Sequence, residues 1–178
     1  NISEHIGSTA LMCIMYLSNG KKYMYIINLG DCRAIMCNKY NIAIPLSKDH
    51  KPHLIEEKLR IETLGGEIKF DGEDYRIMDL SVSRAFGDLD ACPYVTHIPD
   101  IYKYELSDNN KFIILACDGL WDVVSNQEAV DFVIYKLFEN PKINTITGNS
   151  KNNIAKLLAE YAINKGSFDN ISIIIIYI

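Results

Sequence analysis

Four aspartates lie in glycine-containing turns next to apolar runs of strand length, where carboxylates suit the binding of hard cations. Asp118 follows the run Phe112–Cys117, and Asp122 lies in the same turn. Asp31 and Asp169 lie in similar turns elsewhere in the chain. If these turns meet at one edge, they form an oxygen-rich, thiol-free site that prefers Mg²⁺ or Mn²⁺, and two such ions can activate water for in-line displacement at phosphorus. Spacing alone leaves a structural role open, in which each Asp bonds nearby backbone amides.

The element that must position Asp118 is a strand followed by a turn and a helix. Phe112–Cys117 shows no polar alternation, which predicts a strand that is buried on both faces. Ser125 and Glu128 form a capping box in front of an apolar face with helical spacing, so a helix is predicted to start there. The carboxylate of Asp118 is therefore expected at the rim of a rigid sheet.

The other elements follow from apolar periodicity and turn residues. The dipeptide Asn19-Gly20 predicts a hairpin between the first two strands. His50 could be a ligand or a base, but a hydrogen-bonded structural role is expected, because no Cys or Asp stands at ligand spacing. The remaining predictions are an antiparallel meander over Gly7–Leu17, Lys22–Leu29, Cys32–Cys37 and Ile42–Leu46, helices over His53–Leu64 and Ile154–Lys165, a hairpin of Ile68–Phe70 with Tyr75–Met78, an irregular loop over Asp90–Glu105, an exposed connection over Asn140–Asn153, and a mid-sheet strand over Ile171–Ile178. Because regular βαβ alternation is missing, an α+β layered fold is favoured.

Composition restricts the class of protein. A chain of 178 residues with 48% hydrophobic and 23% charged residues predicts one globular domain over residues 1–178. A net charge of -5 argues against a nucleic-acid partner, and the longest apolar segment is far below the ~20 residues of a membrane helix. The five cysteines form no Cys-x-x-Cys pair, which predicts reduced core thiols in a cytoplasmic or nuclear protein.

Seven motifs stand in order along the chain. They are Gly7-Ser8-Thr9-Ala10, Asn28-Leu29-Gly30-Asp31-Cys32-Arg33, Lys48-Asp49-His50-Lys51-Pro52, Gly65-Gly66, Leu80-Ser81-Val82-Ser83-Arg84-Ala85-Phe86-Gly87-Asp88, Ala116-Cys117-Asp118-Gly119-Leu120-Trp121-Asp122 and Gly166-Ser167-Phe168-Asp169-Asn170. Together they resemble the successive motifs of the metal-dependent serine/threonine phosphatases of the PP2C type. The resemblance implies a β-sandwich of two antiparallel sheets flanked by α-helices, with metals bound at one edge.

The resemblance also implies roles for individual residues. Asp118 and Asp169 resemble ligands of a binuclear Mg²⁺ or Mn²⁺ centre, and Asp31, Asp118 and Asp122 resemble a third, weaker metal site. Arg84 either contacts the substrate or the flap, or forms an ion pair with a neighbouring Asp. The implied activity is hydrolysis of phosphoserine and phosphothreonine in protein substrates by metal-activated water, without a phospho-enzyme.

The chain departs from the family pattern at its start. The family carries an N-terminal Arg that grips phosphate and an Asp-Gly-His-Gly stretch with a metal-bridging Asp and the proposed general acid His. Here Asp71-Gly72 is followed by Glu73, and Asp118-Gly119 is followed by Leu120. The sequence is therefore expected to be the last two-thirds of a catalytic domain, with little activity by itself and a tendency to self-associate through exposed sheet edges.

Two other functions remain open from the sequence. A pseudophosphatase or interaction module would keep the fold and bind partners without catalysis. An aspartyl-phosphate enzyme would use Asp118 as its nucleophile, but Leu120 stands where such enzymes commonly have a second acid. A cysteine nucleophile is disfavoured because no Cys-x₅-Arg loop is present.

Overall fold

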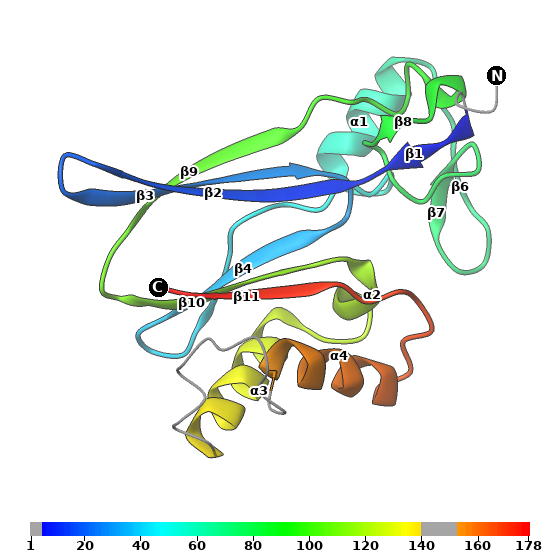
Figure 1. Ribbon diagram of the computed structural model, residues 1–178. Helices are drawn as coiled ribbons and strands as arrows, with labels where there is room; N and C mark the ends of the chain where they lie inside the picture. Colours follow the sequence, from blue (N-terminus) through cyan, green and yellow to red (C-terminus); the bar gives the residue numbers. More distant parts are fainter. Residues whose placement is uncertain (1–4, 140–152) are drawn as a thin grey trace. The chain divides into compact units, whose positions relative to one another are not determined.

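The protein is described by a computed structural model covering residues 5–139 and 153–178, and its backbone forms two units. The first unit comprises Asn1–Met15, Met24–Cys32 and Ser47–Lys103, and the second unit comprises Tyr16–Tyr23, Arg33–Leu46 and Tyr104–Ile178. Both contain antiparallel strands and helices (Figure 1), which confirms the predicted α+β class. The prediction of one domain over residues 1–178 stays a prediction.

The second unit is built around β10 (Asn110–Ala116), whose last five residues are all buried. This strand lies between β11 (Ile173–Tyr177) and β4 (Arg33–Asn38), and β5 (Ala43–Pro45) forms the far edge beyond β4. All three strand pairs are antiparallel. The prediction that an apolar run without alternation is buried on both faces is confirmed for β10.

Helices cover one face of this four-stranded sheet (Figure 1). The short helix α2 (Asp118–Trp121) follows β10, and α3 (Asn126–Glu139) and α4 (Ile154–Asn164) pack against the sheet. Each fully buried Leu, Ile, Val or Phe side chain of such a core contributes about 1.5–3 kcal/mol through burial. The fully buried apolar residues between helices and sheet include Ile35, Phe112, Ile114, Leu120, Val130, Val133 and Leu158.

The starts of α3 and α4 are fixed by side-chain caps. The Ser125 hydroxyl accepts a hydrogen bond from the Glu128 amide at 3.3 Å, which confirms one half of the predicted capping box. The Glu128 carboxylate instead accepts hydrogen bonds from Tyr161 and Lys165 and so joins α3 to α4. Asn153 caps α4 by accepting hydrogen bonds from two amides of its first turn.

The first unit has a smaller core. It contains α1 (Ile55–Thr63), the hairpin of β6 (Ile68–Phe70) and β7 (Tyr75–Ile77), the pair β1 (Gly7–Ser8) and β8 (Phe86–Gly87), and the 3₁₀ helix η2 (Leu89–Ala91). The helix ends where predicted, because Gly65 adopts a φ of +85° that favours glycine. One buried apolar cluster of this unit consists of Ile61, Ile77, Ala85, Ala91 and Val95.

Strands β2 (Ala10–Ser18), β3 (Lys21–Leu29) and β9 (Asp100–Leu106) form a separate three-stranded sheet with β3 in the middle. The hairpin between β2 and β3 is confirmed, since Asn19 and Gly20 both have positive φ, as a type I′ turn requires. The prediction of one meander is wrong, because β4 and β5 belong to the other sheet.

Two further predictions are wrong. The segment Asp90–Glu105 was expected to be irregular, but its second half is β9, which begins directly after Pro99. The final strand was expected mid-sheet, but β11 is the edge of the four-stranded sheet, and Ile174 is 61% exposed. Its four consecutive isoleucines are typical of a central strand. Which strands lie beside β11, however, depends on the order of strands in the sheet. The predicted connection Asn140–Asn153 lies outside the described residues, except for the helix cap Asn153.

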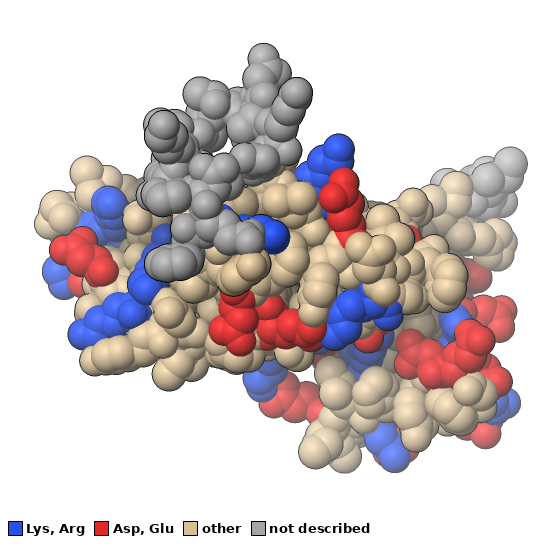
Figure 2. All heavy atoms as spheres, turned by 90° about the horizontal axis from the view of Figure 1, so that it is seen from below, with Lys and Arg blue, Asp and Glu red and all other residues tan. Residues whose placement is uncertain are grey.

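All five cysteines are free thiols, as predicted, although Cys37 alone among them is buried and Cys92 is exposed. Within residues 5–139 and 153–178, none of the helices combines the length and the apolar character needed to cross a bilayer. On the face seen in Figure 2, basic side chains stand in small groups beside acidic ones.

Candidate metal site

Two acidic turns meet in the second unit because β10 and β11 are antiparallel neighbours. Asp118 begins α2 at the end of β10, and Asp169 precedes the start of β11. The register of the two strands pairs Ala116 with Ile173, which brings the turn after β10 next to the turn before β11. The amide of Cys117 also donates to the carbonyl of Ser172 at 3.3 Å, so the ladder continues up to the turns.

Gly119 is required at this contact by lack of space. A Cβ atom at this position would lie 2.4 Å from the Asn170 carbonyl oxygen, which is closer than real Cβ contacts allow. The Ser167 hydroxyl donates to the Gly119 carbonyl at 2.7 Å, and the Cys117 thiol donates to the Asn170 carbonyl at 3.2 Å. Side chains from one turn and backbone from the other thus hold the two acidic turns against each other.

A shallow pocket of about 420 Å³ opens where the turns meet, and both Asp122 and Asp169 line it. Phe168 is fully exposed at this pocket. Asp122 lies one helical turn after Asp118, and its amide donates to the Asp118 carbonyl at 2.9 Å, so the two aspartates are carried by one rigid turn. The structure therefore brings together the turns of three of the four predicted ligands.

The donor set in this place fits part of a cation's coordination shell. Carboxylates on adjoining rigid turns are suitable ligands for Mg²⁺ or Mn²⁺, and Mg²⁺ usually keeps several water ligands. However, no group of three Asp, Glu, His or Cys side chains in the described ranges is close enough to hold a metal ion. The assignment of Asp118, Asp122 and Asp169 as ligands stays a prediction.

Asp31 belongs to the first unit, where it is only 4% exposed. The turn that carries it is fixed by His50: the Gly30 amide donates to His50 Nδ1 at 3.0 Å, and the His50 amide donates to the Gly30 carbonyl at 2.9 Å. Because Nδ1 accepts, the proton lies on Nε2, which donates to Asp100 at 3.2 Å. The predicted structural role of His50 is confirmed, and the metal role of Asp31 stays a prediction.

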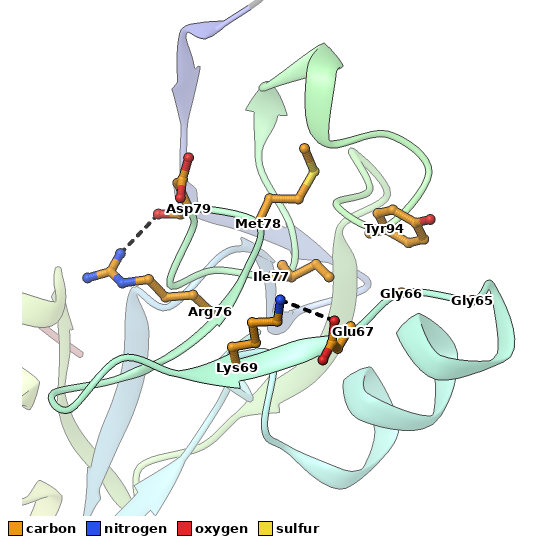
Figure 3. Close-up of a pocket in the computed structure, with 9 residues that line it drawn as sticks. All are labelled: Gly65, Gly66, Glu67, Lys69, Arg76, Ile77, Met78, Asp79 and Tyr94. Atoms are coloured by element: carbon orange, nitrogen blue, oxygen red, sulfur yellow. Dashed lines mark hydrogen bonds and ion pairs between the residues drawn. The ribbon is translucent and has the colours of Figure 1, made fainter.

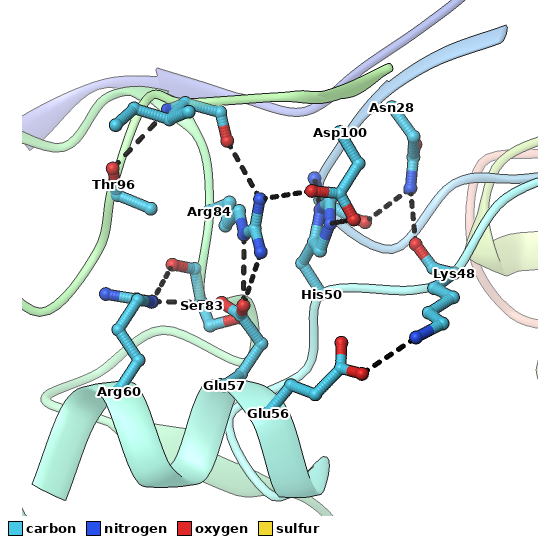
Figure 4. A network of polar contacts seen from close by, with 12 residues as sticks. Asn28, Lys48, His50, Glu56, Glu57, Arg60, Ser83, Arg84, Thr96 and Asp100 are labelled. Carbon is cyan, nitrogen blue, oxygen red and sulfur yellow. Dashed lines mark hydrogen bonds and ion pairs between the residues drawn. The ribbon is translucent and has the colours of Figure 1, made fainter. Parts of the chain in front are cut away.

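Arg84 is the centre of a buried ion network in the first unit (Figure 4). Its guanidinium donates to Glu57 Oε1 at 2.6 and 3.1 Å and to Asp100 Oδ1 at 2.8 Å. Glu57, which is 3% exposed, also accepts from Arg60 at 2.9 Å. These bonds agree with the ion-pair interpretation of Arg84, while a substrate contact stays a prediction.

Charge and burial act against each other in this network. Burial would raise the pKa of Glu57, but hydrogen bonds from Arg84 and Arg60 outweigh it and lower the pKa to about 2. Burial and the nearby Arg84 charge lower the pKa of His50, which favours its neutral form. No pattern in the sequence pointed to Glu57, because an acid in the first turn of an amphipathic helix usually faces solvent.

A second pocket, of about 500 Å³, lies in the first unit (Figure 3). None of the four predicted metal ligands lines it. The basic side chains that line this pocket already have partners: Lys69 forms an ion pair with Glu67, and Arg76 donates to the Asp79 carbonyl at 3.0 Å. The acidic turns of the second unit therefore remain the candidate site.

Comparisons with known proteins identify the family. The sequence model of the family "Protein phosphatase 2C" matches residues 2–171. A PP2C-like domain-containing protein of Acanthamoeba polyphaga mimivirus is 48% identical, with 88% of this chain and 95% of the viral protein covered. The human integrin-linked kinase-associated serine/threonine phosphatase 2C is 39% identical over 97% of this chain but only 45% of its own length.

Solved structures agree with these relatives. A serine-threonine phosphatase 2C from Toxoplasma gondii superposes with a TM-score of 0.79 at 27% identity, covering 99% of this chain and 60% of that protein. A sex-determining protein of C. elegans gives a TM-score of 0.80 at 26% identity, covering 96% of this chain and 40% of that protein. The chain thus spans about half the length of these relatives and nearly all of the viral one. The predicted PP2C-like fold is confirmed, and the chain belongs to the protein phosphatase 2C family.

Proposed function

We propose that this chain carries the metal-binding part of a protein serine/threonine phosphatase that uses Mg²⁺ or Mn²⁺. The observation that supports this function best is the packing of the Asp118 turn against the Asp169 turn, with Gly119 facing the Asn170 carbonyl. In this proposal Asp118 and Asp169 are ligands of the binuclear centre, and Asp31, Asp118 and Asp122 form the weaker third site. The substrates are phosphoserine and phosphothreonine side chains of other proteins.

The residues of this chain would contribute position and charge. Asp118 is fixed at the end of the buried strand β10, and Asp169 is fixed by the contacts between the turns, so little side-chain or backbone entropy is lost on binding a cation. When bound, Mg²⁺ or Mn²⁺ would supply activation of a water molecule and neutralise charge on the phosphoryl oxygens. In this proposal Arg84 contacts the substrate or the flap, while its ion pairs with Glu57 and Asp100 hold the guanidinium in place.

A second function, a non-catalytic module that retains the fold, is favoured by a different observation. In the part of the chain that the structure describes, fewer than three ligating side chains gather at any point. The name of the viral relative likewise refers only to a PP2C-like domain. Retained cation binding together with absent turnover would support this alternative.

We also propose a cytoplasmic or nuclear location, which the free thiols support.

The metal role can be tested without an activity measurement, because the only tryptophan of the chain, Trp121, lies between Asp118 and Asp122. We expect paramagnetic Mn²⁺ to quench Trp121 fluorescence saturably, and Mg²⁺ to reverse this quenching by competition. Asp118→Asn or Asp169→Asn should weaken Mn²⁺ binding by about tenfold or more, since even outer-shell changes typically cost about 10–100-fold.

The matched control is Asp108→Asn, an exposed aspartate before the opposite end of β10. It should leave the quenching curve unchanged. Equal weakening by Asp108→Asn would show that only general surface charge attracts the ion, and the proposed site would then be wrong. A phosphothreonine peptide assay with Mn²⁺ separates the phosphatase from the non-catalytic module.

A further inference from the structure

The edge strand β11 has the composition of a strand that should have two neighbours. Its residues Ile173–Tyr177 contain no charge, proline or glycine, and α4 packs against one of its faces. It pairs with β10 on one side, and the described residues supply no strand on its other side. Natural proteins usually protect an edge with lysine, proline or a bulge, and β11 contains none of these.

The hydrogen-bond parity shows which backbone groups lie on the outer side of β11. The Ile178 amide donates to the Lys111 carbonyl, and the Cys117 amide donates to the Ser172 carbonyl, so the hydrogen-bonded pairs with β10 fall on even positions of β11. In an antiparallel ladder, the intervening residues direct their amides and carbonyls to the other side. The backbone groups of Ile173, Ile175 and Tyr177 therefore point away from β10.

The opposite edge of the same sheet is protected. In β5 the outward positions are 43 and 45, because Leu46 donates to Ala34 and Asn38 donates to Ile42. The outward amide of Ala43 donates to the Gln127 side chain at 3.0 Å, and Pro45 has no amide hydrogen. A further strand thus finds outward amides at β11 but finds none available at β5.

We propose that β11 pairs antiparallel with β11 of a second copy of this chain, around a two-fold axis at Ile175. This register uses the whole strand: Ile175 meets its own copy, and Ile173 meets Tyr177 of the other chain. On the opposite face, Ile174 lies against Ile176 of the other chain. The inference is independent of the proposed phosphatase activity.

A second copy fits this edge better than a charged partner does. Every cross-chain pair in this register joins two aliphatic side chains or an aliphatic side chain with an aromatic one. Such pairs stabilise neighbouring strands, and no like charges meet. The pairing is isologous, and because β5 is protected, the four-stranded sheet closes as a dimer and does not grow by further pairing at β5. One strand pair is smaller than a standard interface, so we expect dissociation in the micromolar range.

The first experiment measures sedimentation velocity of the 178-residue chain from low to high micromolar concentration. A reversible change from the 20.2 kDa monomer to twice that mass is expected. Ile174→Lys should lower the association constant by about tenfold or more. Ile163→Lys, which alters a similarly exposed isoleucine on α4 (57% against 61%), should leave association unchanged.

A charge exchange tests the register itself. Ile174→Lys mixed with Ile176→Glu places opposite charges across the proposed axis, so the mixture should recover association that each variant lacks alone. In the unaltered chain, hydrogen exchange of the Ile173, Ile175 and Tyr177 amides should slow as concentration rises. This second measurement needs no variant and therefore does not depend on the variants folding.

Three results would overturn the proposal. They are a monomer at every concentration, a dimer that Ile163→Lys weakens as much as Ile174→Lys does, and amides of β11 that are protected equally at all concentrations. The last result would mean that a segment of the same chain occupies the edge.

Discussion

With Mn²⁺ present, we expect this chain to hydrolyse a phosphothreonine peptide at least about 10²-fold more slowly than the human phosphatase 2C relative, of which it covers 45%. The motifs that the resemblance assigns to phosphate binding, metal bridging and general acid catalysis are absent from these 178 residues. A bridging carboxylate offsets repulsion between two dications, so without it at least one ion should be bound weakly. Loss of a single preorganised group commonly costs about 10²–10³-fold in rate.

The control for this assay is Asp118→Asn in the same chain. Any slow turnover that Asp118→Asn leaves unchanged comes from a contaminating phosphatase or from uncatalysed hydrolysis. Turnover comparable to that of the human relative, and lost in Asp118→Asn, would contradict the prediction. It would show that the acids of this chain are sufficient for catalysis.

Local sequence was sufficient wherever one short segment decides the structure. The run before Asp118 lacks polar alternation, and β10 is accordingly buried on both faces. Asn19 and Gly20 tolerate positive φ, and the hairpin forms there. Ser125 can cap the amide three residues later, and α3 begins where it does so.

Elements that depend on distant partners were not predictable in this way. β9 follows two prolines and alternates exposed residues such as Lys103 with half-buried ones such as Tyr102 and Tyr104, so its pairing with β3 outweighs the local turn signals. The position of β11 was mistaken because apolar residues on both faces indicate burial but not which strands lie alongside.

The candidate site shows the same division. The sequence identified the acidic turns, but the contact between Gly119 and the Asn170 carbonyl depends on pairing between strands more than 50 residues apart in sequence. Glu57 was missed because Arg84, which donates to it, lies far along the chain. Buried ion networks of this kind leave no periodic signal in a sequence.

The buried network of Glu57 predicts the largest effect on stability. Glu57→Gln should lower the free energy of unfolding by about 3–5 kcal/mol at pH 7, because it removes the buried negative charge that the partly buried Arg60 and Arg84 share. The neighbouring Glu56→Gln is a matched control on the same helix. Its ion pair with Lys48 is exposed on both sides (72% and 64%), so the loss should be below about 1 kcal/mol. Urea unfolding of the three proteins measures both differences.

The pH dependence provides an independent test of the same carboxylate. The folded pKa of Glu57, about 2, lies below its ordinary value of 4.5, so the ionised form contributes stability that is complete above pH 4.5 and is lost as the pH falls towards 2. The difference in unfolding free energy between the unaltered chain and Glu57→Gln should therefore shrink over this range, while the small difference for Glu56→Gln shows no comparable change. If the Glu57→Gln difference is constant from pH 7 down to pH 2, its effect comes from altered packing and not from the charge of Glu57. If both variants cost the same at pH 7, the ion network does not hold the first unit together.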